Sequence, residues 1–258
     1  MHFAALAYVG ESSAEPGRYY DVNVNGTRTL LDAMVAAGVG AIVFSSTCAV
    51  YGEPATATIS EATRPDPINP YGMTKLVCER MMDDFGRAHD LRSIRLRYFN
   101  AAGGDPDLDV GEDHEPETHL IPLVLDAAMG RRPSITIFGD DYPTPDGTAI
   151  RDYIHVADLA RAHVAALGRL LGGSATTALN LGTGRGVSVA ELIACAEQVT
   201  GTTINTSIGA RRPGDPARLV ADPGRAGELL GWSAARSDLA TILGDAWAWH
   251  RQRFAKNA

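Results

Sequence analysis

Two hydrophobic patterns alternate along the first hundred residues. Residues 41–45 form a short continuous hydrophobic run, and residues 93–99 alternate between hydrophobic and polar. Both patterns are typical of strands. In residues 20–37 and 71–88 hydrophobic side chains recur every three or four positions, which predicts amphipathic helices. Strands separated by helices predict right-handed βαβ units and a parallel α/β sheet.

The same alternation continues in the second half of the chain. Helices are predicted at residues 120–130, 156–171, 189–200 and 239–254, and strands at 134–138 and 178–181. We therefore expect a doubly wound parallel sheet of the Rossmann type with a smaller C-terminal α/β substrate subdomain. The expected sheet domain comprises residues 1–100, with 156–184 returning to it, and the subdomain comprises 101–155 and 185–258.

Composition narrows the class of protein. The 258 residues are 45% hydrophobic and carry a formal net charge of -8, which argues against general binding to nucleic acids or anionic membranes. No run of about 18 apolar residues and no signal peptide is found, so we expect a cytoplasmic protein. The three cysteines are Cys48, Cys78 and Cys195. Because their number is odd and they lack a CxxC pattern, we expect no disulfide framework and no cysteine metal site.

Tyr71 and Lys75 are the first candidates for chemistry. Positions i and i+4 share a helix face, so the phenol and the ammonium project together. A free tyrosine has a pKa of about 10, and a neighbouring cation should lower it towards acid–base use. Lysine is rare here, because 21 of the 23 basic residues are arginines, so Lys75 is informative. Such pairs also occur on solvated helix faces, and the pair alone is weak evidence.

Further motifs carry a family resemblance. Thr47 follows the strand at residues 41–45, and a strand-end hydroxyl followed by Tyr-x-x-x-Lys resembles the extended short-chain dehydrogenase/reductase superfamily. Residues 97–100 look like the sugar-nucleotide branch of that superfamily. Three other segments closely resemble the UDP-glucose 4-epimerase family: residues 138–148, 151–156 and 211–215. Related dehydratases have an Asp-Glu pair after the threonine, whereas this chain has Cys48-Ala49, so dehydration is disfavoured.

The resemblance implies NAD-dependent epimerisation of UDP-glucose and UDP-galactose. Tyr71 would remove the proton of the sugar 4-hydroxyl, hydride would pass to NAD, and the 4-keto sugar would turn over before hydride returns. Thr47 would hydrogen-bond the 4-oxygen, and Lys75 would bind the nicotinamide ribose and tune Tyr71. The resemblance further places near NAD the residues Phe3, Ala4, Ala5 and Phe99.

The resemblance also implies a UDP-binding set. Arg151 and Arg212 would bind the pyrophosphate, and Asp215 would accept ribose hydroxyls. The remaining substrate residues would be Asn100, His119, Leu120, Thr136, Ile137 and Phe138. Leu219 lies near the position that gates N-acetylated sugars and modestly favours glucose and galactose, so a UDP-N-acetylhexosamine epimerase is an alternative. A homodimer through helices 20–37 and 71–88 is the superfamily habit.

A glycine-rich dinucleotide loop is not found in these residues. A dinucleotide fold normally starts with a strand, a GxxGxxG-type loop and a helix, whereas residues 1–6 read as the end of a buried strand. We therefore expect a truncated sheet, and a chain that by itself neither holds NAD tightly nor epimerises; micromolar or better affinity for NAD in a calorimetric titration would contradict this. Two explanations of the missing loop are possible. The chain is a fragment of an ordinary epimerase, or it is an inactive or non-catalytic module that binds UDP-sugars or mediates dimerisation.

The segment His114–His119 superficially resembles a zinc-binding helix. Its histidines are five residues apart and Pro116 interrupts it, so the HExxH pattern is not met. We therefore expect no metal.

Overall fold

The computed structural model describes residues 1–212 and 214–254, in two compact units. Pro213 of the 211–215 motif and Lys256 lie outside the described residues. Unit 1 comprises Met1–Tyr98, Arg161–Leu181 and Asp222–Trp232. Unit 2 comprises Phe99–Ala160, Gly182–Ala221 and, as far as it is described, Ser233–Ala258.

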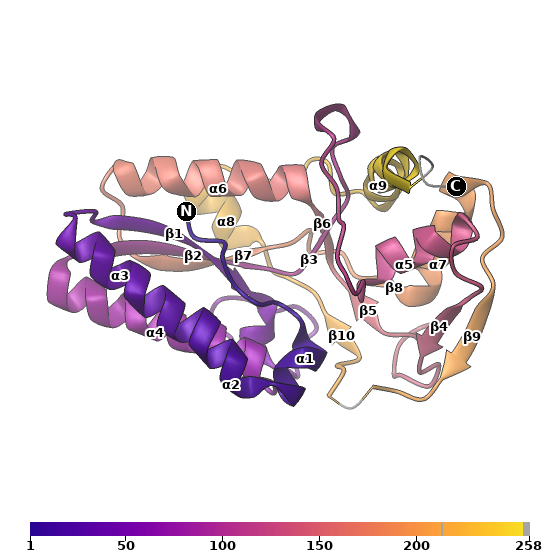
Figure 1. Cartoon of the computed structure of the whole chain (residues 1–258), viewed down its shortest axis with the longest axis horizontal. Helices are drawn as coiled ribbons and strands as arrows, with labels where there is room; N and C mark the ends of the chain where they lie inside the picture. Colours follow the sequence, from indigo (N-terminus) through magenta and orange to yellow (C-terminus); the bar gives the residue numbers. More distant parts are fainter. Residues whose placement is uncertain (213, 255–258) are drawn as a thin grey trace. The chain divides into compact units, whose positions relative to one another are not determined.

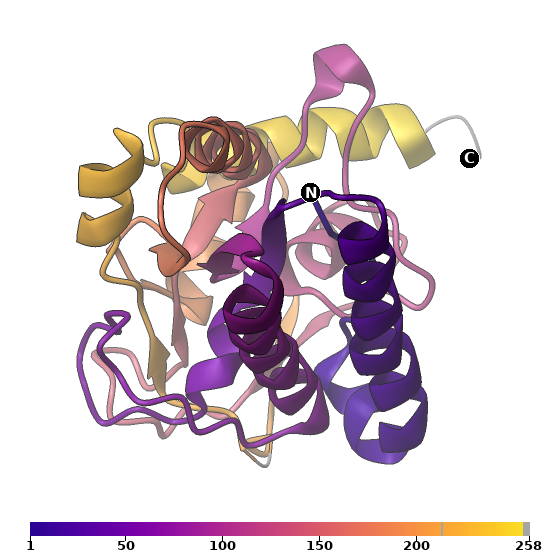
Figure 2. The same cartoon turned by 90° about the vertical axis from the view of Figure 1, so that its left-hand side faces the viewer.

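Unit 1 is built around a three-stranded parallel sheet in the order β1-β2-β7. Helices cover both faces, with α3 and α4 on one side and α6 and α8 on the other (Figure 1). Figure 2 shows the same layers with α6 end-on. The elements are β1 (Ala41–Thr47), β2 (Arg92–Tyr98), β7 (Thr177–Leu181), α1 (Val9–Ala14), α2 (Pro16–Tyr19), the π-helix η1 (Tyr20–Asn25), α3 (Gly26–Ala36), the 3₁₀-helix η2 (Cys48–Tyr51), α4 (Pro70–His89), α6 (Val156–Leu171) and α8 (Gly224–Leu230).

The predicted parallel α/β fold is confirmed, and the burial of β1 gives its physical basis. Six consecutive residues of β1 are buried, as expected for a strand covered on both faces. On the α3–α4 face, hydrophobic side chains from two helices and the sheet share one core: Leu31, Ile42, Phe44, Cys78, Met82 and Leu91. This core fixes α4, and with it Tyr71 and Lys75, against the end of β1.

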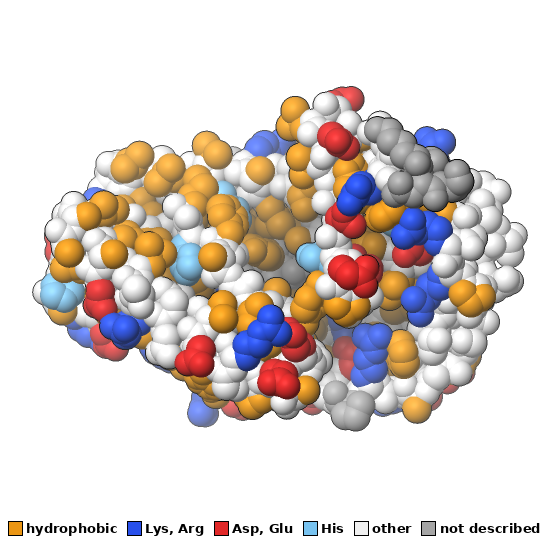
Figure 3. Space-filling model, in the orientation of Figure 1, with side chains coloured by type: hydrophobic (Ala, Val, Ile, Leu, Met, Phe, Trp, Pro, Cys, Tyr) orange, Lys and Arg blue, Asp and Glu red, His pale blue; other side chains and the backbone are white. Residues whose placement is uncertain are grey.

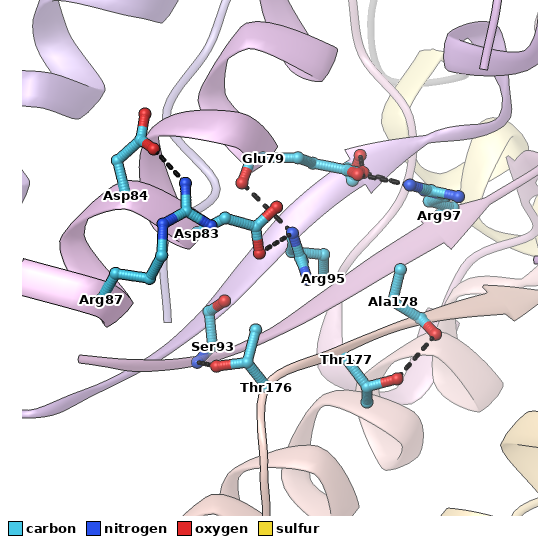
Figure 4. Close-up of polar contacts among 11 residues, drawn as sticks. Glu79, Asp83, Asp84, Arg87, Ser93, Arg95, Arg97, Thr176, Thr177 and Ala178 are labelled. Atoms are coloured by element: carbon cyan, nitrogen blue, oxygen red, sulfur yellow. Dashed lines mark hydrogen bonds and ion pairs between the residues drawn. The ribbon is translucent and has the colours of Figure 1, made fainter. Parts of the chain in front are cut away.

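A charged network joins α4 to β2 (Figure 4). The buried carboxylate of Glu79 accepts hydrogen bonds from Arg97 Nε at 2.9 Å and from Ser46 Oγ at 2.6 Å. Asp83 accepts one from Arg95 Nη1 at 2.9 Å. Arg97 also donates to the Tyr51 hydroxyl at 2.9 Å. Arg95 and Arg97 of β2 can therefore be buried, because each has a carboxylate of α4 beside it.

Unit 2 combines short sheets with three longer helices. Its strands pair as β3-β6, β4-β9 and β10-β5-β8. Its hydrophobic core lies among α5, α7 and α9 and includes Val124, Leu125, Leu192, Ala196, Ile242 and Leu243. The elements are β3 (Asn100–Ala102), the 3₁₀-helix η3 (Pro106–Leu108), α5 (Leu120–Ala128), β4 (Ile135–Phe138), β5 (Ile150–Arg151), β6 (Tyr153–His155), β8 (Val187–Ser188), α7 (Val189–Thr200), β9 (Thr206–Gly209), β10 (Arg218–Leu219) and α9 (Leu239–Phe254).

Two local expectations were wrong. The single helix predicted at residues 20–37 is a π-helix followed by an α-helix, because Thr27 and Cys78 side chains both bond the Asn23 carbonyl oxygen, at 2.6 and 3.2 Å. Residues 1–6 do not form a buried strand. They make one parallel bridge, from His2 to Phe44, and Phe3 is 55% exposed because within the structure only β1 pairs with this segment.

Among the described residues, no helix is both long and hydrophobic enough to cross a membrane. Acidic, basic and hydrophobic side chains are interspersed on the face shown in Figure 3. This surface agrees with the absence of a strongly basic balance in the sequence.

Candidate active site

The start of α4 brings the Tyr-x-x-x-Lys motif to the end of β1. Asn69 caps the helix, with its side-chain oxygen accepting a hydrogen bond from Gly72 N at 2.8 Å, and Pro70 occupies the first turn. A Cβ atom on Gly72 would lie 2.5 Å from the Ala49 carbonyl oxygen. Glycine is therefore required for the close approach of α4 to η2, the turn that follows Thr47.

The structure brings together the three residues predicted to be catalytic. The Thr47 hydroxyl lies close enough to the Tyr71 phenol to act on its pKa, which it lowers. Lys75 Nζ lies 6.0 Å from the centre of the Tyr71 ring and donates a hydrogen bond to the Ser45 carbonyl oxygen at 2.8 Å. Lys75 is buried and Tyr71 is half-buried. A hydroxyl, a phenol and an ammonium thus converge at the carboxyl end of a parallel strand, where such sheets bind ligands.

The pKa of Tyr71 differs from the sequence-based expectation. Burial raises it well above the usual range, the neighbouring Tyr98 phenol adds to this, and the Thr47 hydroxyl acts in the opposite direction. Burial also lowers the pKa of Lys75 to about 8. The predicted lowering of the Tyr71 pKa is therefore wrong for this structure, because the loss of hydration outweighs the ammonium 6.0 Å from the ring.

Three further contacts hold this site and were not predicted. Ser12 Oγ accepts a hydrogen bond from Tyr71 N at 3.2 Å, and Tyr98 Oη bonds Ser45 Oγ. Asn23 Nδ2 bonds Thr74 Oγ1 at 3.1 Å. The local pattern around Ser12 carries no indication of this contact, because its partner lies 59 residues away. Tyr98 was part of a recognised motif, which could have indicated it.

The residues expected near NAD fall in both units. Phe3, Ala4 and Ala5 lie in the segment that follows the bridge to β1, and the Phe3 ring lies 4.8 Å from that of His163. Asn23 holds the end of this segment through paired hydrogen bonds with the backbone of Leu6, at 2.8 and 3.0 Å. Phe99 is buried in unit 2.

In unit 2 the predicted nucleotide-binding residues occur as contacting pairs. Arg151 and Asp215 form an ion pair, although the sequence analysis assigned them to different parts of UDP. The Arg212 guanidinium lies 4.0 Å from the centre of the Phe138 ring, over its face. Thr136 and Ile137 precede Phe138 in β4, whose backbone pairs with β9.

The other predicted residues of unit 2 are held by backbone contacts. Asn100 donates from both its backbone and its side-chain nitrogen to the Asp152 carbonyl oxygen, at 2.9 and 3.0 Å. His119 precedes Leu120, the first residue of α5, and its Nδ1 lies 2.7 Å from Glu112. Hydrogen bonds with Glu112 and Glu117 raise the pKa of His119 to about 10.

Asp152 was not predicted as a site residue, yet it organises several loops of unit 2. Its buried carboxylate accepts hydrogen bonds from the backbone of Thr183, Gly184 and Ala221, at 2.9 to 3.1 Å.

A separate cavity in unit 2 has a volume of about 570 Å³, and none of the predicted site residues lines it.

Comparison with known proteins identifies the group of enzymes to which this arrangement corresponds. The model of the NAD dependent epimerase/dehydratase family matches residues 1–182. A UDP-glucose 4-epimerase of Rhizobium meliloti is 53% identical over 253 residues, which cover 98% of this chain and 77% of that protein.

Solved structures give the same result. A UDP-glucose 4-epimerase from Brucella ovis in complex with NAD superimposes with a TM-score of 0.93 at 51% identity, over 95% of this chain and 76% of that one. One from Bifidobacterium longum in complex with NAD+ and UDP superimposes with a TM-score of 0.92 at 39% identity, over 100% and 77% of the two chains.

Proposed function

Because this chain belongs to the NAD dependent epimerase/dehydratase family, we propose that it is a UDP-glucose 4-epimerase that interconverts UDP-glucose and UDP-galactose. The contact of Tyr71 with Thr47 beside Lys75 is the structural observation that supports the proposal most directly. Epimerases named for this reaction and about 50% identical over nearly the whole chain support it independently.

The residues of unit 1 fit the nicotinamide end of NAD. Lys75 donates one hydrogen bond to the Ser45 carbonyl oxygen. Because an ammonium group has three N–H donors, Lys75 can also donate to a ribose hydroxyl. Phe3, Ala4 and Ala5 supply a small, largely apolar segment beside the same sheet. When bound, NAD supplies the oxidation chemistry by accepting hydride from the sugar and returning it.

Tyr71 would exchange the proton of the sugar 4-hydroxyl. Its phenolate oxygen, formed once the phenol has given its own proton to solvent, would take that proton as the sugar carbon is oxidised, and the resulting phenol would return it when the 4-keto sugar is reduced on its other face. Thr47 would hold the sugar oxygen by a hydrogen bond. Burial raises the pKa of Tyr71, so its phenolate, once formed, is a strong proton acceptor.

Unit 2 would bind the nucleotide. Arg151 and Arg212 can donate to the pyrophosphate, and the face of Phe138 offers a stacking surface bordered by Thr136 and Ile137. Asp215 would accept ribose hydroxyls, while Asn100, His119 and Leu120 would contact the phosphates or sugar. Leu219, half-buried in β10, favours hexoses without an N-acetyl group. A cytoplasmic homodimer completes the proposal.

The function is tested by the change Tyr71→Phe. The purified protein is incubated with UDP-galactose and millimolar NAD, because the sequence predicts weak NAD retention, and UDP-glucose is measured by chromatography. We expect turnover by the wild type and its loss in the variant. UDP-galactose affinity should stay within about twofold, because only one oxygen is removed and the uniform binding of the substrate is retained.

Arg212→Ala provides the complementary control. It should weaken UDP-galactose binding by about tenfold or more, because a charge-assisted contact to the pyrophosphate is lost. Turnover by Tyr71→Phe close to that of the wild type would contradict the proposal. UDP-galactose binding without conversion by the wild type would favour a non-catalytic UDP-sugar-binding module instead.

A further inference from the structure

Four side chains ahead of α5 meet in one place. Glu112, His114, Glu117 and His119 each offer a donor atom, and these four atoms lie within 4.8 Å of one another. The segment His114–His119 does not follow the HExxH helix pattern, so its sequence predicts no metal site. In the structure Glu112 joins the group from outside that segment.

The donor atoms have the spacing of a metal-binding group. His119 Nδ1 lies 2.7 Å from Glu112 and 3.0 Å from Glu117, and His114 Nδ1 lies 3.2 and 3.7 Å from the same two carboxylates. In a tetrahedral zinc site, bonds of about 2.0 to 2.1 Å place neighbouring donors about 3.4 Å apart. The four distances bracket this value, and the four donor atoms lie within 4.8 Å of one another, so side-chain shifts of about 1 Å would bring them to tetrahedral spacing.

The surroundings also suit a bound cation. The carboxylate of Glu117 is held by hydrogen bonds from the backbone nitrogens of Thr118 and His119, both at 2.7 Å, which fixes one ligand in place. Both glutamates are largely covered, while the histidine side chains are 45% and 48% exposed and leave an entry path. Two carboxylates would balance the charge of a divalent ion, which would displace any proton from the ligating imidazole nitrogens.

We propose that Glu112, His114, Glu117 and His119 form a binding site for a divalent transition-metal ion of the zinc type. Imidazole and carboxylate ligands suit zinc, cobalt and nickel better than the all-oxygen sites of magnesium and calcium. The proposed metal group shares His119 with the substrate-binding residues proposed above, and it includes neither Tyr71, Lys75 nor Thr47.

The test is calorimetric titration of the chelator-treated protein with zinc chloride, without NAD or UDP-sugar, so its outcome does not depend on the proposed epimerase function. We expect one equivalent to bind. His114→Asn and Glu112→Gln should each weaken binding at least about tenfold, because each removes a ligand. His89→Asn, which alters an exposed histidine of α4, is the matched control and should bind as the wild type does.

Cobalt(II) identifies the ligands. Binding at this site should give a visible ligand-field band without the near-ultraviolet charge-transfer band of a cysteine thiolate. Absence of saturable zinc binding would overturn the proposal. Binding that survives both His114→Asn and Glu112→Gln, or a thiolate band in the cobalt spectrum, would overturn it as well. Circular dichroism of each variant verifies that the fold is retained.

Discussion

Burial acts in opposite directions on the two ionisable groups expected to carry the chemistry. It raises the pKa of Tyr71 and lowers that of Lys75 to about 8. Both shifts disfavour the charged form, as expected where water is excluded. The ammonium nevertheless has a hydrogen-bond acceptor, the Ser45 carbonyl, which fixes its position. Burial in the site therefore favours the uncharged forms of both Tyr71 and Lys75 more than their spacing in the sequence suggests.

The Lys75 pKa makes stability depend on pH. Between about pH 8 and 10.5 the folded chain binds fewer protons at Lys75 than the unfolded chain, so the free energy of unfolding rises with pH in this window. Below about pH 8 the cost of burying the charged Lys75 ammonium lowers the free energy of unfolding by its full amount. From pH 7.5 to 9.5 the wild type should gain roughly 2 kcal/mol relative to Lys75→Met, measured by urea unfolding.

The control for this change is Arg80→Met, which removes an exposed cation from the same helix. Its stability should follow pH as the wild type does. Parallel pH curves for wild type and Lys75→Met would show that the lysine keeps its ordinary pKa in the folded chain.

At the scale of elements, α4 is held on the sheet by charge as well as by hydrophobic packing. Glu79 lies opposite Arg97 (Figure 4). Its carboxylate also accepts a hydrogen bond from Ser46, one residue before Thr47 in β1. Arg97 in turn contacts Tyr51 in η2, and Tyr51 bonds Asn180 of β7 at 2.7 Å. One carboxylate of α4 thereby ties together β1, β2 and, through Tyr51, β7.

We expect Glu79→Gln to lower the free energy of unfolding by about 3 to 5 kcal/mol, because it leaves the buried Arg97 without its counter-charge. Asp84→Asn on the same helix is the matched control. It breaks the exposed pair with Arg87 and should leave stability unchanged. Urea unfolding measures the effect of both changes on the free energy of unfolding. Equal effects would show that the buried Glu79–Arg97 pair stabilises the fold no more than the exposed Asp84–Arg87 pair does.

At the scale of the whole molecule, each unit has a core of its own and carries a different part of the expected function. Unit 1 holds Tyr71 and Lys75, and unit 2 holds Arg151 and Arg212. The chain passes between the units several times, since unit 1 includes Arg161–Leu181 and Asp222–Trp232. Each unit is therefore assembled from segments that are far apart in the sequence.

Oligomeric state is a property of the whole molecule that can be tested directly. The proposed homodimer uses η1, α3 and α4, where Val22 is 44% exposed. Val22→Asp should convert the dimer to a monomer in light scattering after size exclusion, because a charge would be buried in an apolar interface. Val164→Asp on α6, where the residue is 66% exposed, should leave the mass unchanged. A monomeric wild type would refute the proposed dimer.

The sequence by itself determined the parallel α/β class, the bounds of α6, α7 and α9, and the common helix face of Tyr71 and Lys75. These follow from periodicity and spacing, which are local properties of the chain. Only the tertiary structure decided the direction of the Tyr71 pKa shift and the pairing of Arg151 with Asp215. It also decided the approach of Glu112 to the two histidines. Burial and charge pairing depend on residues from distant segments, and no local pattern records them.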